Sequence, residues 1–298
     1  MPQRPTYALF LRLGAALSFG TMAMLIKYAG DLGISLPQIM VWRQAVPIPV
    51  LLAFLWFTGG LGKLRTRRMG SHALRSVIDM VGMVCNFGSV LLLPLAEATT
   101  LGFTAPFFAV LIGTLILREH VGIWRWTAVL LGFAGVLIVA QPGGHPVALL
   151  GVLAGLGAGL TVAVVSFLIR DLAKSEDSIA IVFYFSVFGA LIAAATLPLV
   201  PFVMPGPKEM ALLACMGLAG TLGQLLMTAS LRHGAVVSVI VLDYTSLIWA
   251  TIYGWLIWDL LPPFATWIGA PLIIGAGVLI AWREHRLGKE KPIDLARS

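Results

Sequence analysis

The chain has 298 residues, of which 59% are apolar and only 11% are charged, and its mean hydropathy is +0.96. Soluble domains carry about 25% charged residues, so this composition excludes a soluble enzyme or a solvated binding module. The net charge of +7 fits loop cations of a membrane protein that touch anionic lipid, and it does not indicate a nucleic-acid partner.

Apolar stretches follow one another along the whole chain. A membrane span needs about 20 mostly apolar residues, and each span should be helical because helices satisfy their own backbone polar groups inside lipid. Barrel strands would alternate apolar and polar residues, whereas these runs are continuous. The sequence therefore predicts an all-α integral membrane protein with ten transmembrane helices, at residues 8–30, 36–58, 73–93, 97–117, 123–140, 147–169, 179–200, 208–231, 235–257 and 264–282.

Two cations lie inside the first two predicted spans, and ionisable residues at such positions are functional hypotheses by default. Lys27 is near the outer end of the first span, four residues before Asp31, and Arg43 is in the second span. The Arg43 guanidinium could hold a carboxylate with two parallel hydrogen bonds. The alternatives are structural: an ion pair with a nearby acid, or a side chain that extends toward the interface.

The third and fourth predicted spans contribute an amide, a proline and an aromatic side chain. Asn86, near the middle of the third span, is a candidate solute contact, or else a helix–helix hydrogen-bonding group. Phe107 either lines a cavity or packs in the core. Pro106 removes a helix hydrogen bond and predicts a kink, which would suit a gate.

The loops predict the orientation. With the N-terminus in the cytoplasm, the inner loops hold the run KLRTRR at 63–68 and most other loop cations, and the outer loops hold only Lys208. Cytoplasmic loops of membrane proteins are enriched in Lys and Arg. We therefore expect both termini on the cytoplasmic side of a bacterial inner membrane.

The second half of the chain carries the sharpest candidate. Asp243 lies within the ninth predicted span with no Lys or Arg within one helical turn, so it could accept a coupling proton or pair with an ammonium group of a solute. The alternative is a neutral acid held by hydrogen bonds. Gln224 lies at a position roughly equivalent to Asn86, and paired midplane polar groups predict a solute site. Tyr244 and Trp249 either line a cavity or pack.

Two stretches of the chain resemble each other. APFFAVLIGTLIL, Arg118-Glu119 and LLGFAGVLIV in the first half correspond to LDYTSLIWATIYGWLIW, Asp259 and APLIIGAGVLIA in the second. Five spans per half is an odd number, so the second half should enter the bilayer inverted, as in many secondary transporters. This predicts a five-helix repeat at 1–144, an inverted repeat at 145–284, a charged cytoplasmic tail at 285–298, and a central cavity.

These motifs resemble the drug/metabolite transporter superfamily of the EamA type. The resemblance rests on WRQ at 42–44, LPLAEATTLGFTAPFF at 93–108, the Arg118-Glu119 segment, and LDYTSLIWATIYGWLIWD with GAPLIIGAGVLIA. It implies ten helices in two inverted five-helix repeats, a central cavity and alternating access. The pattern is most similar to bacterial amino-acid exporters, including aromatic amino-acid exporters, although Asp259 stands where the family has Glu.

The sequence therefore predicts a secondary transporter that exports amino acids or similar small metabolites. Its expected partners are that solute and membrane lipids, with protons as a candidate coupling ion; no nucleic acid, cofactor, metal or protein partner is indicated. No HExxH, GxSxG, CxxC or GxxxxGK[ST] motif occurs. A multidrug or hydrophobic-cation exporter of the same fold is the alternative, and an intramembrane enzyme or a lipid scramblase is the alternative from another class.

Overall fold

The computed structural model describes residues 5–115, 123–140, 148–172, 175–233 and 241–294, and within these ranges it is all-helical, with no strand. The helices of the first half are α1 (Pro5–Asp31), α2 (Leu36–Ala45), α3 (Pro47–Phe57), η1 (Leu61–Leu64), α4 (Met69–Leu92), α5 (Leu95–Gly102), α6 (Ala105–Leu115) and α7 (Ile123–Ala140). The second half contributes α8 (Leu149–Leu172), α9 (Ser178–Thr196), η2 (Leu197–Leu199), α10 (Pro207–His233), η3 (Val241–Thr245), α12 (Ser246–Trp258) and α13 (Phe264–Asp294).

The described residues include seven helical segments that are long and apolar enough to cross a membrane. Two further apolar helices, Trp126–Val139 and Phe264–Ile280, are shorter and lie where the fifth and tenth spans are predicted. Residues 235–240 of the predicted ninth span lie outside the described residues, and the rest of that span forms η3 and most of α12. The chain is thus a multi-pass helical membrane protein.

Two of the predicted spans are interrupted, each next to a proline. Pro106 predicts a kink, and the structure shows an interruption of the helix at this place, since α5 ends at Gly102 and α6 begins at Ala105. A second interruption, which the sequence analysis did not predict, separates α2 from α3 at Val46, just before Pro47. Proline lacks the backbone N–H that would continue the hydrogen-bond ladder, so both breaks have the same cause.

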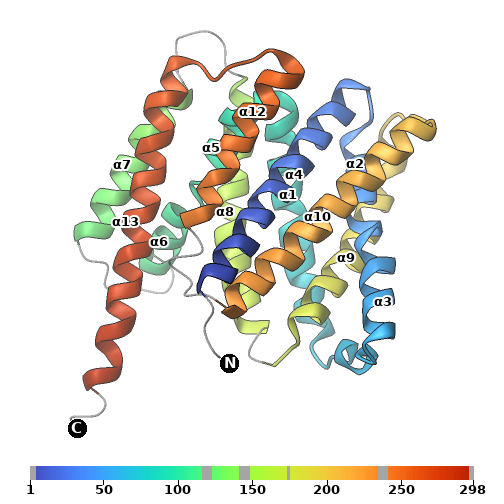
Figure 1. Ribbon diagram of the computed structural model, residues 1–298, viewed down its shortest axis with the longest axis horizontal. Coiled ribbons are helices and arrows are strands. Elements are labelled where there is room, and N and C mark those ends of the chain that lie inside the picture. The colour runs from blue at the N-terminus through green and yellow to red at the C-terminus, as the bar shows by residue number, and fades with distance from the viewer. Residues whose placement is uncertain (1–4, 116–122, 141–147, 173–174, 234–240, 295–298) are drawn as a thin grey trace.

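Helices that are distant in sequence lie side by side and run in opposite directions (Figure 1). Contacts of Gly14 with Leu226 and of Gly223 with Phe19 set α1 antiparallel to α10. Among the described helices, α4 and α8, α2 and α9, and α7 and α13 also pack as antiparallel pairs. Glycine permits the closest of these approaches, as small residues do in membrane bundles.

The contact between α7 and α13 shows how close this approach is. A Cβ atom added at Gly135 would lie 2.8 Å from the carbonyl oxygen of Gly269, and one added at Gly269 would lie 2.7 Å from the carbonyl oxygen of Gly135. Neither position can hold a larger side chain unless the helices separate.

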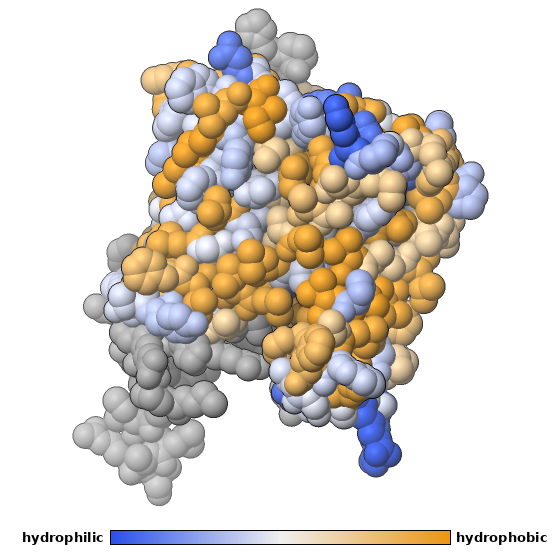
Figure 2. All heavy atoms as spheres, turned by 45° about the vertical axis from the view of Figure 1, so that its right-hand side comes forward, coloured by the Kyte–Doolittle hydropathy of each residue, from blue (hydrophilic) through white to orange (hydrophobic). Residues whose placement is uncertain are grey.

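The outer surface of the bundle is strongly apolar. Phe57, Leu199 and Phe264 are each about four-fifths exposed or more, and apolar side chains cover much of the face seen in Figure 2, while the most hydrophilic residues lie toward its upper and lower ends. In water such a surface would drive association, whereas in lipid it is the expected exterior.

Candidate functional site

A cavity of about 290 Å³ lies among α1, α4, α5 and α12. Its wall on α1 is formed by Phe19, Gly20, Met22 and Ala23, and the facing wall by Asn86 and Val90 of α4. Gly102 at the end of α5 contributes to the free space, because a Cβ atom added there would meet no heavy atom within 4 Å. We call this space the central cavity.

The central cavity combines an apolar wall with a few polar groups. Asn86, Thr99 and Ser246 supply an amide and two hydroxyls, and Phe19 and Phe103 supply aromatic rings. Within the described residues the Asn86 amide makes no hydrogen bond. An amide that faces a cavity inside a membrane bundle without a protein partner is available to a ligand.

Near the start of α1, an ion pair links this helix to the second half of the chain. Arg12 donates from Nε to Oδ1 of Asp243 at 2.5 Å, and its Nη2 donates to Oδ2 in a second bond. The Arg12 side chain is 6% exposed and the Asp243 side chain 41% exposed. Asp243 is therefore not an isolated acid. Its cationic partner, Arg12, lies near the opposite end of the sequence. This fork-like pairing is the strong form of an ion pair.

Near the other end of α1, Lys27 makes a second set of polar contacts. Its Nζ donates to the carbonyl oxygens of Leu93 at 2.8 Å and Val90 at 3.2 Å, and it lies 5.9 Å from the centre of the Trp258 ring. Asp31, expected as its helix neighbour, instead accepts a hydrogen bond from Trp258 Nε1 at 2.6 Å. Lys27 thus links α1 to the ends of α4 and α12. The cavity-lining segment of α1 lies between these two polar contacts.

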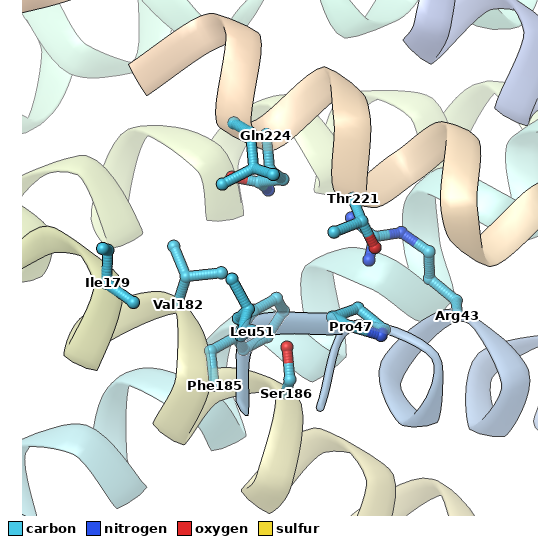
Figure 3. Close-up of a pocket in the computed structure, with 10 residues that line it drawn as sticks. Arg43, Pro47, Leu51, Ile179, Val182, Phe185, Ser186, Thr221 and Gln224 are labelled. Carbon is cyan, nitrogen blue, oxygen red and sulfur yellow. The ribbon is translucent and has the colours of Figure 1, made fainter. Parts of the chain in front are cut away.

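Arg43 occupies a different place, beside a smaller cavity enclosed by α2, α3, α9 and α10, which we call the lateral cavity (Figure 3). The space is about 30 Å³, and Thr221 and Gln224 of α10 line it together with Ser186 of α9. Arg43 is 5% exposed, and its Nε donates to Met22 Sδ at 3.1 Å. Since Met22 also lines the central cavity, the guanidinium lies between the two spaces.

The structure separates several residues that the sequence analysis grouped together. Asn86 and Gln224, expected as a midplane pair, line different cavities. Phe107 is fully buried and packs against Phe133 and Gly132 instead of lining the central cavity. Its position matches the packing alternative.

Three further predicted residues lie close to the cavity wall. Tyr244 contacts the cavity residue Phe103 edge-to-face, with ring centroids 4.8 Å apart. Trp249 packs against Gly20, where a Cβ atom would lie 2.9 Å from the Trp249 Cβ. Pro106 follows the break that ends α5 beside Gly102. All three residues therefore lie next to residues that line the central cavity.

The partner of Asp243 and most of the cavity wall could not be found from the sequence. Arg12 lies near the start of the first predicted span, where a cation is typical of a cytoplasmic loop. Phe19, Thr99, Phe103 and Ser246 are ordinary residues for a membrane helix, so no composition signal distinguishes them. Only the helix packing places them around one space.

A bundle of apolar helices around a solute-sized cavity, with polar contacts at both ends of one cavity helix, defines a multi-pass membrane protein of the transporter class. The sequence profile of the EamA-like transporter family matches residues 6–141 and again residues 149–282. The chain therefore belongs to the EamA-like transporter family, within the drug/metabolite transporter superfamily to which its motifs pointed.

The curated relatives are similar over nearly their full length. The pseudopaline exporter CntI of Pseudomonas aeruginosa is 29% identical over 275 residues, covering 90% of this chain and 93% of the relative. A riboflavin transporter of Vibrio cholerae is 27% identical, covering 94% and 95%. An S-adenosylmethionine uptake transporter of Rickettsia bellii is 27% identical, covering 81% and 82%. These names describe transporters of small molecules.

A solved crystal structure shares the fold. It superposes with a TM-score of 0.66 at 20% identity, covering 95% of this chain and 99% of the other. At that identity the likeness concerns the fold alone.

Proposed function

We propose that this protein is a secondary transporter that exports amino acids or similar small metabolites, and that the central cavity holds the solute. The observation that carries the proposal is the Asn86 amide, which has no hydrogen-bond partner among the described residues and lies in a cavity bounded along α1 by the Arg12–Asp243 and Lys27 contacts. Substrate sites of secondary transporters lie near mid-membrane between the two halves.

The chemistry of the wall favours a small, overall neutral solute. A volume of about 290 Å³ is at the lower end of ligand-binding pockets. Amide and hydroxyl groups can orient the charged ends of a zwitterion, and the Phe19 and Phe103 rings can cover an apolar or aromatic side chain. The relatives named for pseudopaline, riboflavin and S-adenosylmethionine support a polar metabolite as the cargo class.

We also propose that the chain forms ten spans in two inverted five-helix repeats, 1–144 and 145–284, followed by a cytoplasmic tail at 285–298. The twofold match of the family profile supports the division. The contacts support the inversion, because they recur when the halves are exchanged: α6 contacts α8 as α12 contacts α1, and α4 contacts α9 as α10 contacts α2.

Alternating access follows from this arrangement. α1 is tied to η3 by Arg12 and Asp243 on one side of the cavity, and to α4 by Lys27 on the other. Rocking of one half against the other would release these contacts in turn, with the Pro106 break as a hinge. The positive-inside pattern supports cytoplasmic termini in a bacterial inner membrane, and protons are the candidate coupling ion.

The alternative is export of hydrophobic cations, for which Asp243 would be the counter-charge. The Arg12 pair opposes it, since a cationic solute would have to compete with a guanidinium already bound through two hydrogen bonds. A neutral cavity with hydroxyl and amide groups is the better match to an amino acid.

Reconstitution separates these functions. Proteoliposomes containing the purified protein would be tested with a labelled amino-acid panel and with tetraphenylphosphonium, each with and without a pH gradient. Saturable flux of one or more amino acids, unaffected by the cation, supports the proposal. Flux of the cation alone would identify the alternative, and lipid flipping without solute flux would refute both.

A further inference from the structure

The lateral cavity has buried polar groups of its own, and their role does not depend on what the central cavity transports. Three of its polar lining residues are almost completely buried: Arg43 on the α2 side is 5% exposed, Ser186 on α9 is 1% exposed and Thr221 on α10 is 4% exposed. Figure 3 shows the Ser186 oxygen directed into the space, and the guanidinium beside Thr221.

Arg43 is a buried charge that forms no ion pair in the part of the chain that the structure describes. Its one hydrogen bond within the described residues is to the Met22 sulfur, which is a weak acceptor. Asp79 is the described acid that acts on it electrostatically, but that carboxylate is ion-paired with Arg75 at 2.8 Å. Two buried guanidinium groups therefore share one carboxylate, which leaves an excess positive charge.

The Ser186 hydroxyl is also available to a ligand. Ser186 makes no hydrogen bond within the described part of the chain, although serine in a helix can bond to a carbonyl one turn earlier. Thr221 does so, donating to the Gly217 carbonyl at 2.8 Å, so its oxygen is free only to accept. An uncompensated buried charge is costly, and a bound anion would satisfy both Arg43 and Ser186.

Glycine at position 220 fixes where the guanidinium lies. A Cβ atom added at Gly220 would come within 2.6 Å of Arg43 Nε and 2.7 Å of Met22 Sδ. Any side chain at this position would displace the guanidinium from the wall, so the small residue is part of the site.

We propose that the lateral cavity binds a small monovalent anion, held by Arg43 and Ser186. Its volume of about 30 Å³ has room for one or two water-sized groups. This admits a halide ion or a single carboxylate group, and it is far too small for a whole amino acid. The site is thus separate from the solute cavity, although Met22 touches both.

The test measures the melting temperature of the purified protein in sodium gluconate, with chloride or bromide replacing gluconate at constant ionic strength. A halide that binds only the folded protein should raise the melting temperature in a saturable way, by several degrees at full occupancy. Arg43→Gln and Gly220→Ala should abolish the rise, and Ser186→Ala should shift its midpoint to higher chloride. Arg68→Gln is the control, because it removes a surface cation paired with Asp171 and should keep the full response.

Two results would overturn the proposal: no difference between chloride and gluconate in the unmodified protein, or an equal response in Arg43→Gln. If Arg43→Gln fails to fold, Ser186→Ala decides, and a chloride midpoint unchanged from the unmodified protein would refute the site. A second arm titrates acetate against chloride to learn whether a carboxylate can take the same place. Labelled chloride flux is measured in parallel. A rise in melting temperature without chloride flux would show that the anion is bound by the protein and is not transported.

Discussion

At the scale of single residues, the site depends on a few polar side chains whose partners decide their roles. Asn86 has no partner within the described residues and faces the central cavity, Asp243 is bound by Arg12, and Arg43 lies by the lateral cavity. The sequence could identify these residues because polar groups are rare inside membrane spans. It could not assign their partners, because Arg12 and Asp243 meet only through packing of α1 against η3.

Asn86→Ala is expected to weaken solute binding without destabilising the fold. One hydrogen bond contributes about 1 kcal/mol, which corresponds to a roughly fivefold loss of affinity. Affinity would be measured by solute titration and stability by melting temperature. Val84→Ala, on the exposed face of the same helix, should change neither, and equal loss of affinity and stability in Asn86→Ala would indicate a packing role.

Asp243→Asn and Arg12→Gln are each expected to slow transport and to lower the free energy of unfolding by roughly 2 kcal/mol, since each leaves a charge without its partner. The exchanged pair, Arg12→Asp with Asp243→Arg, should recover part of both losses. Flux in proteoliposomes at two pH values provides the second readout. If the exchanged pair recovers stability but not flux, and the pH dependence of flux changes, Asp243 would instead take a direct part in proton or solute binding.

At the scale of elements, prolines and glycines determine the shape of the bundle. The Pro106 break was predictable because its residue type disrupts helices wherever it occurs. The Pro47 break was equally visible in the sequence, but the run of apolar residues around it reads as one continuous span. Contacts between glycines, such as Gly135 with Gly269, could not be predicted. The number of glycines in a helix does not show which other helix packs against it.

Gly135→Leu is expected to destabilise the protein by roughly 1–3 kcal/mol, the usual cost of inserting a side chain into a filled contact. The cause would be separation of α7 from α13, where the carbonyl oxygen of Gly269 occupies the space of the new Cβ. Ala134→Leu, at the neighbouring exposed position, should leave the melting temperature within error. Unchanged stability in Gly135→Leu would show that the two helices do not touch as described.

At the scale of the whole molecule, composition was enough to predict a helical membrane protein, and the resemblance of its motifs to a known family indicated the EamA type. Apolar runs give helices in lipid for reasons that need no tertiary information, and the family profile matches both halves. The cavity wall was not predictable, because it is assembled from α1, α4, α5 and α12 through contacts far apart in sequence. Asn86 and Gln224 line different cavities for this reason, since equivalent positions in two halves need not face one space.

The central claim is that solute passes through the cavity among these four helices, and Gly102→Leu tests it most directly. A Cβ atom at this position would meet no heavy atom within 4 Å. The protein should therefore fold and melt normally, while saturable solute flux in proteoliposomes falls by tenfold or more, on the order of 1.4 kcal/mol. Gly275→Leu, which also meets no atom within 4 Å but lies at an exposed position of α13, should transport normally. Undiminished flux through a correctly folded Gly102→Leu protein would contradict the account.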